Sequence, residues 1–181
     1  MKVLISGGCK NGKSAFAERE AMRLAAGGPL YYVATMIPFD EEDRARIRKH
    51  IAERGGKGFV TVEQPRDIAA CLEKAEPEAC FLIDSLTALL LNEQYPHSFM
   101  DPPDPGAPER CREGLLEIVR RAKHAVFVTD YIYSDAARYS RETEAFREAL
   151  ASLDKALAEV CDQVIELCAG NVVYHKGGHG A

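Results

Sequence analysis

A chain of 181 residues has the length of one α/β domain and can bury a substantial core. A formal net charge of -5 disfavours a surface that binds nucleic acid, because such a surface carries a basic field. No apolar run approaches the roughly 20 residues that a membrane-spanning helix needs. Because Met1 and Lys2 lead directly into an apolar run of strand length, we expect no signal peptide. The 6 cysteines form no C-x-x-C pair, so we expect reduced thiols, a cytoplasmic protein and no zinc site.

Apolar runs of strand length alternate with helical patterns along the whole chain. The expected strands are residues 3–5, 30–35, 59–62, 80–84, 125–129, 163–167 and 171–174. The expected helices are residues 14–26, 40–54, 65–75, 86–91 with an open end, 109–123 and 141–161. A Pro-rich stretch, residues 96–108, is expected to be an exposed connection.

This alternation predicts a mostly parallel sheet with helices on both faces. The last two strands follow each other too closely for a crossover, so they are expected to form an antiparallel hairpin at one edge. No internal repeat or domain boundary interrupts the pattern. We therefore expect a single nucleotide-binding domain over residues 1–181, with residues 176–181 as a flexible tail.

Residues 7–14 spell G-x-x-x-x-G-K-S between the first expected strand and the first expected helix. In this strand–loop–helix context the motif is typical of a P-loop. Its glycines allow backbone N–H groups to converge on a phosphate at a helix N-terminus. Lys13 is expected to reach the β- and γ-phosphates, and the Ser14 hydroxyl to ligate Mg²⁺. The sequence therefore predicts a nucleoside triphosphate site.

The apolar strand at residues 80–84 ends in a carboxylate, Asp84. In P-loop proteins an acidic residue at this position lies beside the Mg²⁺ that the P-loop hydroxyl holds. We therefore expect Asp84 to bind metal together with Ser14. The alternative is that Asp84 caps the helix that follows it.

The charged helix carries Arg46, His50 and Arg54 at a spacing of four residues, so these side chains share one face. Ile47 and Ile51 form an adjacent apolar stripe that we expect to dock the helix on the sheet. One interpretation is a solvated basic face. The other is that two guanidinium groups flank an imidazole where a polyphosphate binds, and that their charge keeps the imidazole neutral and able to attack phosphorus.

The pattern from Gly7 to Asn92 resembles the adenosylcobinamide kinase/adenosylcobinamide-phosphate guanylyltransferase family of cobalamin biosynthesis. The residues that carry the resemblance are the P-loop, the Ala-Thr that ends the second strand, R-I-x-x-H-x-x-x-R at residues 46–54, Thr-x-Glu at residues 61–63, and the strand ending at Asp84 with the following Leu86, Thr87 and Asn92.

The resemblance implies a RecA-like P-loop NTPase fold and a homo-oligomer, typically a trimer. It implies that His50 is the nucleophile that takes GMP from GTP, and that adenosylcobinamide is phosphorylated with ATP or GTP and Mg²⁺. Lys13 would join His50 as a catalytic residue. The residues that would contact the nucleotide are Gly7, Gly8, Cys9, Lys10, Asn11, Gly12, Lys13, Ser14, Ala34, Thr35, Met36, Arg46, Ile51, Ala52, Glu53, Arg54, Glu63 and Asp84.

After the fifth strand the chain departs from the family pattern of an Asn-Glu-Val-Gly run and a Gly-Ile-Val-Pro loop. Residues 130–136 read D-Y-I-Y-S-D-A, although Arg147 after Phe146 still matches. Asp130 is either an acidic group near the acceptor hydroxyl or a turn residue. This departure leaves open an enzyme that uses a different acceptor. A nucleotide-binding regulatory module without catalysis is the other alternative.

Overall fold

The computed structural model describes residues 1–8, 10–76, 78–133 and 135–178, without the side chains of residues 46, 49 and 53. The contacts predicted for Cys9, Arg46 and Glu53 therefore lie outside the described residues.

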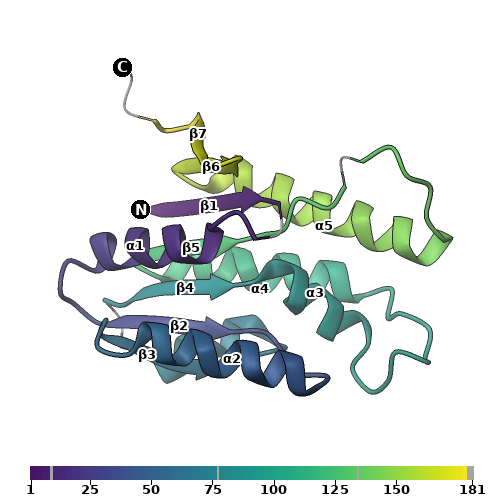
Figure 1. Ribbon diagram of the computed structural model, residues 1–181, viewed down its shortest axis with the longest axis horizontal. Helices are drawn as coiled ribbons and strands as arrows, with labels where there is room; N and C mark the ends of the chain where they lie inside the picture. Colours follow the sequence, from purple (N-terminus) through teal and green to yellow (C-terminus); the bar gives the residue numbers. More distant parts are fainter. Residues whose placement is uncertain (9, 77, 134, 179–181) are drawn as a thin grey trace.

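The fold is a seven-stranded sheet in the order β3-β2-β4-β5-β1-β6-β7 (Figure 1). Strands β1 to β6 run parallel, and β7 runs antiparallel to β6. The strands are β1 (Lys2–Gly7), β2 (Leu30–Ala34), β3 (Phe59–Glu63), β4 (Cys80–Asp84), β5 (His124–Val128), β6 (Gln163–Cys168) and β7 (Asn171–Lys176). The predicted parallel sheet with a C-terminal hairpin is confirmed.

Helices cover both faces of this sheet. The helical elements are α1 (Lys13–Ala25), α2 (Glu41–Arg54), the 3₁₀ helix η1 (Ile68–Lys74), α3 (Leu86–Gln94), α4 (Ala107–Arg121) and α5 (Arg141–Val160). In Figure 1, α1 and α2 lie in front of the sheet and α4 and α5 lie behind it. Among the described helices, none is long and apolar enough to cross a membrane.

Two hydrophobic clusters form the core, one on each face of the sheet. Ala17, Ala21 and Leu24 of α1 pack on Val3, Ile5 and other strand residues of one face. The other face is covered by η1, α3, α4 and α5, whose buried residues include Leu89, Leu115 and Leu153. Because β1, β4 and β5 are covered on both sides, they are nearly continuous apolar runs.

Two predicted boundaries are wrong for local reasons. The helix expected at residues 65–75 is the shorter η1, because Asp67 takes a left-handed conformation (φ 47°) that a helix cannot contain. The amide of Gln64 donates to the carbonyls of Arg66 and Asp67 and fixes this turn. Helix α4 begins at Ala107, so Pro108 lies in its first turn, where no intrahelical N–H is needed.

The C-terminal strand reaches further than predicted. β7 continues to Lys176, the first residue of the expected tail. Its end is fixed because the Lys176 ammonium donates to the carbonyls of Ala158 and Glu159 at the end of α5. Residues 179–181 lie outside the description.

Candidate nucleotide-binding site

The carboxyl ends of the parallel strands meet at one edge of the sheet, and a cavity of about 800 Å³ lies there. The strand register aligns Ala34 with Glu63 and with Asp84. The P-loop follows β1 at the same edge, and Asp130 follows β5. The predicted site residues that line the cavity are Ser14, Ala34, Met36, His50, Ile51, Arg54, Glu63 and Asp84.

The P-loop is anchored to its neighbouring strands. The Asn11 amide donates to the Leu167 carbonyl of β6 at 2.6 Å, and the Tyr131 N–H donates to the Gly7 carbonyl at 3.0 Å. A side chain at Gly7 would meet that same Leu167 carbonyl at 2.6 Å. Gly12 has a φ of 88°, which favours glycine at the start of α1. The glycines of the motif therefore serve close packing and a left-handed turn.

Lys13 is almost completely buried, with 8% of its side chain exposed. Its ammonium donates to the Gly8 carbonyl at 2.6 Å and lies 3.0 Å from Asp130 Oδ1. An ammonium has three N–H groups, so these two contacts leave one for a further acceptor such as a phosphate oxygen. Lys13 therefore connects the P-loop to the residue that follows β5.

Asp84 and Ser14, the two residues predicted to hold metal, line the same cavity. The Ser14 hydroxyl hydrogen-bonds to the Asp84 carboxylate, and the Tyr32 hydroxyl donates to Asp84 Oδ2 at 3.2 Å. Burial raises the pKa of Asp84, against the effect of these two hydrogen bonds and of the nearby His50. A hydroxyl beside a carboxylate fits Mg²⁺, which takes few protein ligands and fills its shell with phosphate and water.

The capping alternative for Asp84 is resolved by its neighbour. Ser85 is the N-cap of α3, since its hydroxyl accepts from the Ala88 N–H. The backbone of Ser85 is tied to β2, because its N–H donates to Thr35 Oγ1 at 2.7 Å and its carbonyl accepts from the same hydroxyl at 2.8 Å. The Thr35 side chain is buried, and these two hydrogen bonds fix the backbone of Ser85, which lines the cavity. Asn92 of α3 extends this support, donating to the carbonyls of Thr35 and Pro65.

Helix α2 brings His50 to the cavity wall, and its predicted place near the phosphates stays a prediction. The apolar stripe beside it was expected to dock the helix on the sheet, and this prediction is wrong. Ile47 and Ile51 line the cavity, and Ile51 is 52% exposed. The stripe therefore presents apolar surface to the space that a ligand would occupy. Ala52 is exposed and lies outside the cavity wall.

Arg54 attaches the end of α2 to the rest of the fold. Its guanidinium lies 3.5 Å from the ring centroid of Tyr32 and 3.9 Å from Glu18 of α1. Lys57 reaches the same Glu18 carboxylate at 2.6 Å. Arg54 is 7% exposed, and its buried Nε has no hydrogen-bond partner among the described residues.

Sequence reasoning missed Tyr32, Glu18 and Thr87 as parts of this site. Tyr32 precedes Ala34 by two residues in β2, and this spacing puts both side chains on one face of the sheet. This two-residue spacing along the strand was the sequence signal that could have placed Tyr32 in the site. Thr87 lines the cavity, and its hydroxyl accepts from the Asp130 N–H at 3.3 Å.

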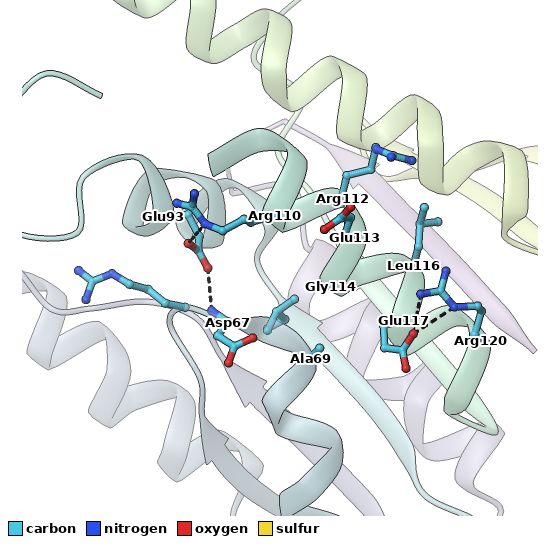
Figure 2. Close-up of a pocket in the computed structure, with 12 residues that line it drawn as sticks. Asp67, Ala69, Glu93, Arg110, Arg112, Glu113, Gly114, Leu116, Glu117 and Arg120 are labelled. Carbon is cyan, nitrogen blue, oxygen red and sulfur yellow. Dashed lines mark hydrogen bonds and ion pairs between the residues drawn. The ribbon is translucent and has the colours of Figure 1, made fainter. Parts of the chain in front are cut away.

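A second hollow of about 720 Å³ lies between α4 and the turn before η1. Figure 2 shows two ion pairs among its charged side chains, Arg120 with Glu117 and Arg110 with Glu93. Glu93 also accepts from the Asp67 N–H at 2.7 Å. None of the residues predicted for the nucleotide lines this hollow.

The strand order and the P-loop define a P-loop ATPase fold, and solved structures agree. One solved ATPase domain matches with a TM-score of 0.55 and 13% identity, over 97% of this chain and 76% of that one. An ATPase from the type III secretion system of pathogenic bacteria matches with a TM-score of 0.55 and 12% identity, over 93% of this chain and 51% of that one. These likenesses show the fold.

Sequence comparison defines the family. Residues 3–174 match the profile of the cobinamide kinase / cobinamide phosphate guanyltransferase family, and the chain belongs to this family of bifunctional enzymes. The bifunctional adenosylcobalamin biosynthesis protein CobP of Pseudomonas aeruginosa is 31% identical over 98% of both chains. The corresponding protein CobU of Salmonella typhimurium is 26% identical over 94% of this chain and 97% of its own length.

Proposed function

We propose that this chain phosphorylates the side-chain hydroxyl of adenosylcobinamide with ATP or GTP and then transfers GMP from GTP onto the new phosphate. The transfer passes through a guanylyl group on His50. The observation that carries this proposal is that His50, Ser14 and Asp84 line one cavity. A nucleoside triphosphate held by the P-loop can therefore present its α-phosphorus to the imidazole.

In the kinase step, Lys13 and the P-loop N–H groups hold the phosphates while the acceptor hydroxyl attacks the γ-phosphorus in line. The Ser14 hydroxyl and the Asp84 carboxylate would hold Mg²⁺. The chemistry that a bound Mg²⁺ supplies is neutralisation of the charge that develops on the phosphate oxygens.

In the guanylyl step, a bond forms between a ring nitrogen of His50 and the α-phosphorus, and the bond to the β-phosphate breaks, so that pyrophosphate leaves. The phosphate of the acceptor then attacks the same phosphorus and releases the imidazole. A covalent intermediate divides one difficult transfer into two easier ones. Glu63, on the cavity wall, supports a preference for guanine, whose N1–H and amino group can donate to a carboxylate.

Two lesser expectations accompany this proposal. We propose a cytoplasmic protein, in line with the free thiols of Cys71, Cys80, Cys111, Cys161 and Cys168 among the described cysteines. The homo-oligomer implied by the family resemblance stays a prediction, and a trimer is expected by size-exclusion chromatography with light scattering.

The test is incubation with GTP labelled at the α-phosphate, followed by peptide mapping. Label on His50 is expected, and the adduct should be lost in acid and survive mild alkali because it is a phosphoramidate. His50→Ala should abolish labelling and GMP transfer while sparing phosphorylation of the hydroxyl, which needs no imidazole. His175→Ala is the matched control, since His175 is exposed on β7 at the far edge of the sheet.

Label on another residue, or none from an enzyme that still phosphorylates the acceptor, would overturn the assignment of His50. An enzyme that is labelled on His50 but cannot phosphorylate adenosylcobinamide would overturn the kinase half alone.

A further inference from the structure

Asp130 lies at the point where the nucleotide phosphates and an incoming acceptor would meet. It follows β5, which lies between the P-loop strand β1 and the Asp84 strand β4. Its side chain lines the same cavity as Ser14, Asp84 and His50. No role in the reaction derived above uses this carboxylate.

The backbone around Asp130 is fixed on both sides. The Thr129 hydroxyl donates to the buried Asp154 of α5 at 3.1 Å. The Asp130 N–H donates to the Thr87 hydroxyl at 3.3 Å, and the next N–H, that of Tyr131, donates to the Gly7 carbonyl at 3.0 Å. These bonds connect Asp130 to α3, to α5 and to the P-loop, so its carboxylate has a defined position relative to the bound phosphates.

Because Asp130 contacts Lys13, its carboxylate would lie beside the transferred phosphoryl group. Asp130 Oδ1 lies 3.0 Å from the ammonium that, in a P-loop, contacts the β- and γ-phosphates. One N–H of Lys13 can hold Asp130 while another holds a γ-phosphate oxygen. A hydroxyl that attacks the γ-phosphorus from the side of Asp130 would come within hydrogen-bond reach of the second carboxylate oxygen.

We propose that Asp130 is a catalytic residue of the phosphorylation step and receives the hydroxyl proton of the acceptor. This assignment rests on the kinase function proposed above. A bond forms between the acceptor oxygen and the γ-phosphorus, and the bond from the γ-phosphorus to the bridging oxygen breaks, so that the nucleoside diphosphate leaves with that electron pair. The hydroxyl proton passes to the Asp130 carboxylate and then to solvent. A carboxylate 35% exposed can release it there.

The competing explanation is that Asp130 only neutralises Lys13 in the absence of nucleotide. The two roles predict opposite results for removal of the charge. If Asp130 is only a counter-ion, its loss frees Lys13 for the phosphates, so nucleotide binds at least as tightly and phosphorylation is at least as fast. If Asp130 takes the proton, nucleotide binding is kept or improved while the rate of phosphorylation falls.

The experiment measures phosphorylation of adenosylcobinamide, nucleotide affinity and guanylylation of His50 for the wild-type enzyme, Asp130→Asn, Asp130→Ala and the control Asp101→Asn. Asp101 is an exposed carboxylate outside the cavity wall. The kcat for phosphorylation should fall by about a hundredfold or more in both Asp130 variants, the usual contribution of a positioned base. The KM for the nucleotide should stay the same or decrease, and added formate should restore part of the activity of Asp130→Ala.

If the wild-type enzyme phosphorylates the acceptor and Asp130→Asn does so with an equal kcat, the proposed role of Asp130 is wrong. The proposed kinase function would still stand. Equal losses of phosphorylation, nucleotide affinity and guanylylation would overturn it too, because they would show that Asp130 maintains the nucleotide site. A wild-type enzyme that forms guanylyl-histidine but no phosphorylated acceptor would overturn the kinase function, and the role of Asp130 with it. Asp130→Asn, which is nearly isosteric, keeps the test decisive if Asp130→Ala does not fold.

Discussion

Asp154 is a buried carboxylate behind the residues that carry the proposed chemistry. Only 6% of it is exposed, and Oδ2 accepts from the Thr129 and Tyr133 hydroxyls, while the buried Oδ1 has no partner among the described residues. Burial raises the pKa of Asp154 to about 6, because removal from water penalises the charged form more than the two hydrogen bonds favour it.

This pKa predicts a pH dependence of stability. In the unfolded chain an aspartate has a pKa of about 4, so between about pH 4 and pH 6 the folded state binds the proton more tightly. The contribution of Asp154 to stability is therefore fully present below about pH 4 and lost as the pH rises through about 6. Urea unfolding of the wild type and Asp154→Asn from pH 4 to pH 7.5 should show the wild type losing about 2–3 kcal/mol relative to the variant.

Asp101→Asn should follow the wild type across the same range, because its carboxylate is exposed. A constant difference between the wild type and Asp154→Asn at every pH would mean that Asp154 titrates alike in the folded and unfolded chain, and would contradict the explanation by burial.

The residues that could be predicted are those whose role depends on the local chain. Lys13 and Ser14 are set by a motif of adjacent residues, and Asp84 by its place at the end of an apolar strand. Tyr32, Glu18 and Asp154 depend on how separate elements lie against one another. A single sequence carries no record of that register, so the cation–π contact and the buried carboxylate became visible only in the fold.

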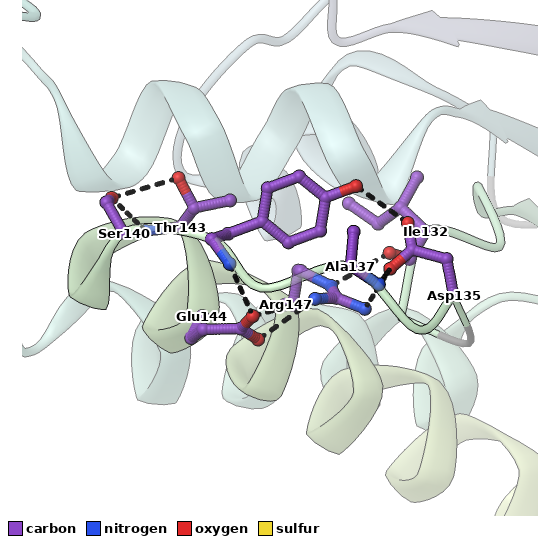
Figure 3. A network of polar contacts seen from close by, with 8 residues as sticks. Ile132, Asp135, Ala137, Ser140, Thr143, Glu144 and Arg147 are labelled. Carbon is purple, nitrogen blue, oxygen red and sulfur yellow. Dashed lines mark hydrogen bonds and ion pairs between the residues drawn. The ribbon is translucent and has the colours of Figure 1, made fainter.

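Arg147 of α5 contacts several described residues of the segment between β5 and α5. Figure 3 shows Arg147 between Glu144 and Asp135, at 2.9 Å and 3.1 Å, with Nε donating to the Ile132 carbonyl at 3.0 Å. Its guanidinium also lies 4.7 Å from the ring centroid of Tyr139. Ile132 and Asp135 belong to the segment in which the sequence departs from the family pattern, so Arg147 connects α5 to described residues of that segment near Asp130.

We expect Arg147→Ala to loosen this loop without harming the nucleotide site. Loss of hydrogen bonds to charged partners should cost about 1–3 kcal/mol of unfolding free energy. The KM for the corrinoid acceptor should rise about tenfold, the loop should become sensitive to limited proteolysis, and guanylylation of His50 should continue. Arg141→Ala, at the exposed start of the same helix, is the control and should change none of these.

If Arg147→Ala reduces guanylylation as much as acceptor turnover, the loop serves the nucleotide, and the expectation that it governs the acceptor is wrong. Replacement of residues 130–139 by the usual family sequence would then be expected to reduce both activities together.

Helix α2 shows why the prediction of an element can be right and the prediction of its packing wrong. The helix expected at residues 40–54 is present as Glu41–Arg54, and Asp40 is its N-cap, because its carboxylate accepts from the Asp43 N–H at 2.8 Å. Its apolar stripe was expected in the core because apolar side chains are usually buried. An apolar stripe can also line a ligand site. Only the position of α2 over the strand ends distinguishes a stripe that lines a ligand site from one that packs in the core.

Across the whole molecule, the site is assembled from the carboxyl ends of strands that are far apart in the sequence. Five different strands contribute to the site: Ala34, Glu63 and Asp84 end β2, β3 and β4, while the P-loop and Asp130 follow β1 and β5. Because these strands are parallel, their carboxyl ends lie at one edge of the sheet. Their geometry is therefore a property of the folded sheet. A ligand that binds across these strand ends should stabilise the fold as a unit.

Nucleotide binding should accordingly raise the melting temperature, and the rise should depend on Mg²⁺. At a GTP concentration a hundredfold above its dissociation constant, the stabilisation is about 2.7 kcal/mol, or roughly 5–10 °C for a domain of this size. Removal of Mg²⁺ with EDTA should shrink the rise, because Ser14 and Asp84 then face the phosphates without a cation between them.

The variant that tests this dependence is Asp84→Asn. It should give the same small rise with and without Mg²⁺, since a neutral amide is a weak ligand for this ion. Asp101→Asn should keep the full dependence on Mg²⁺. Each variant is compared with itself, so any change in its intrinsic stability cancels. A full Mg²⁺-dependent rise in Asp84→Asn would mean that the metal is held elsewhere, and that Asp84 serves the cavity through its hydrogen bond from Tyr32.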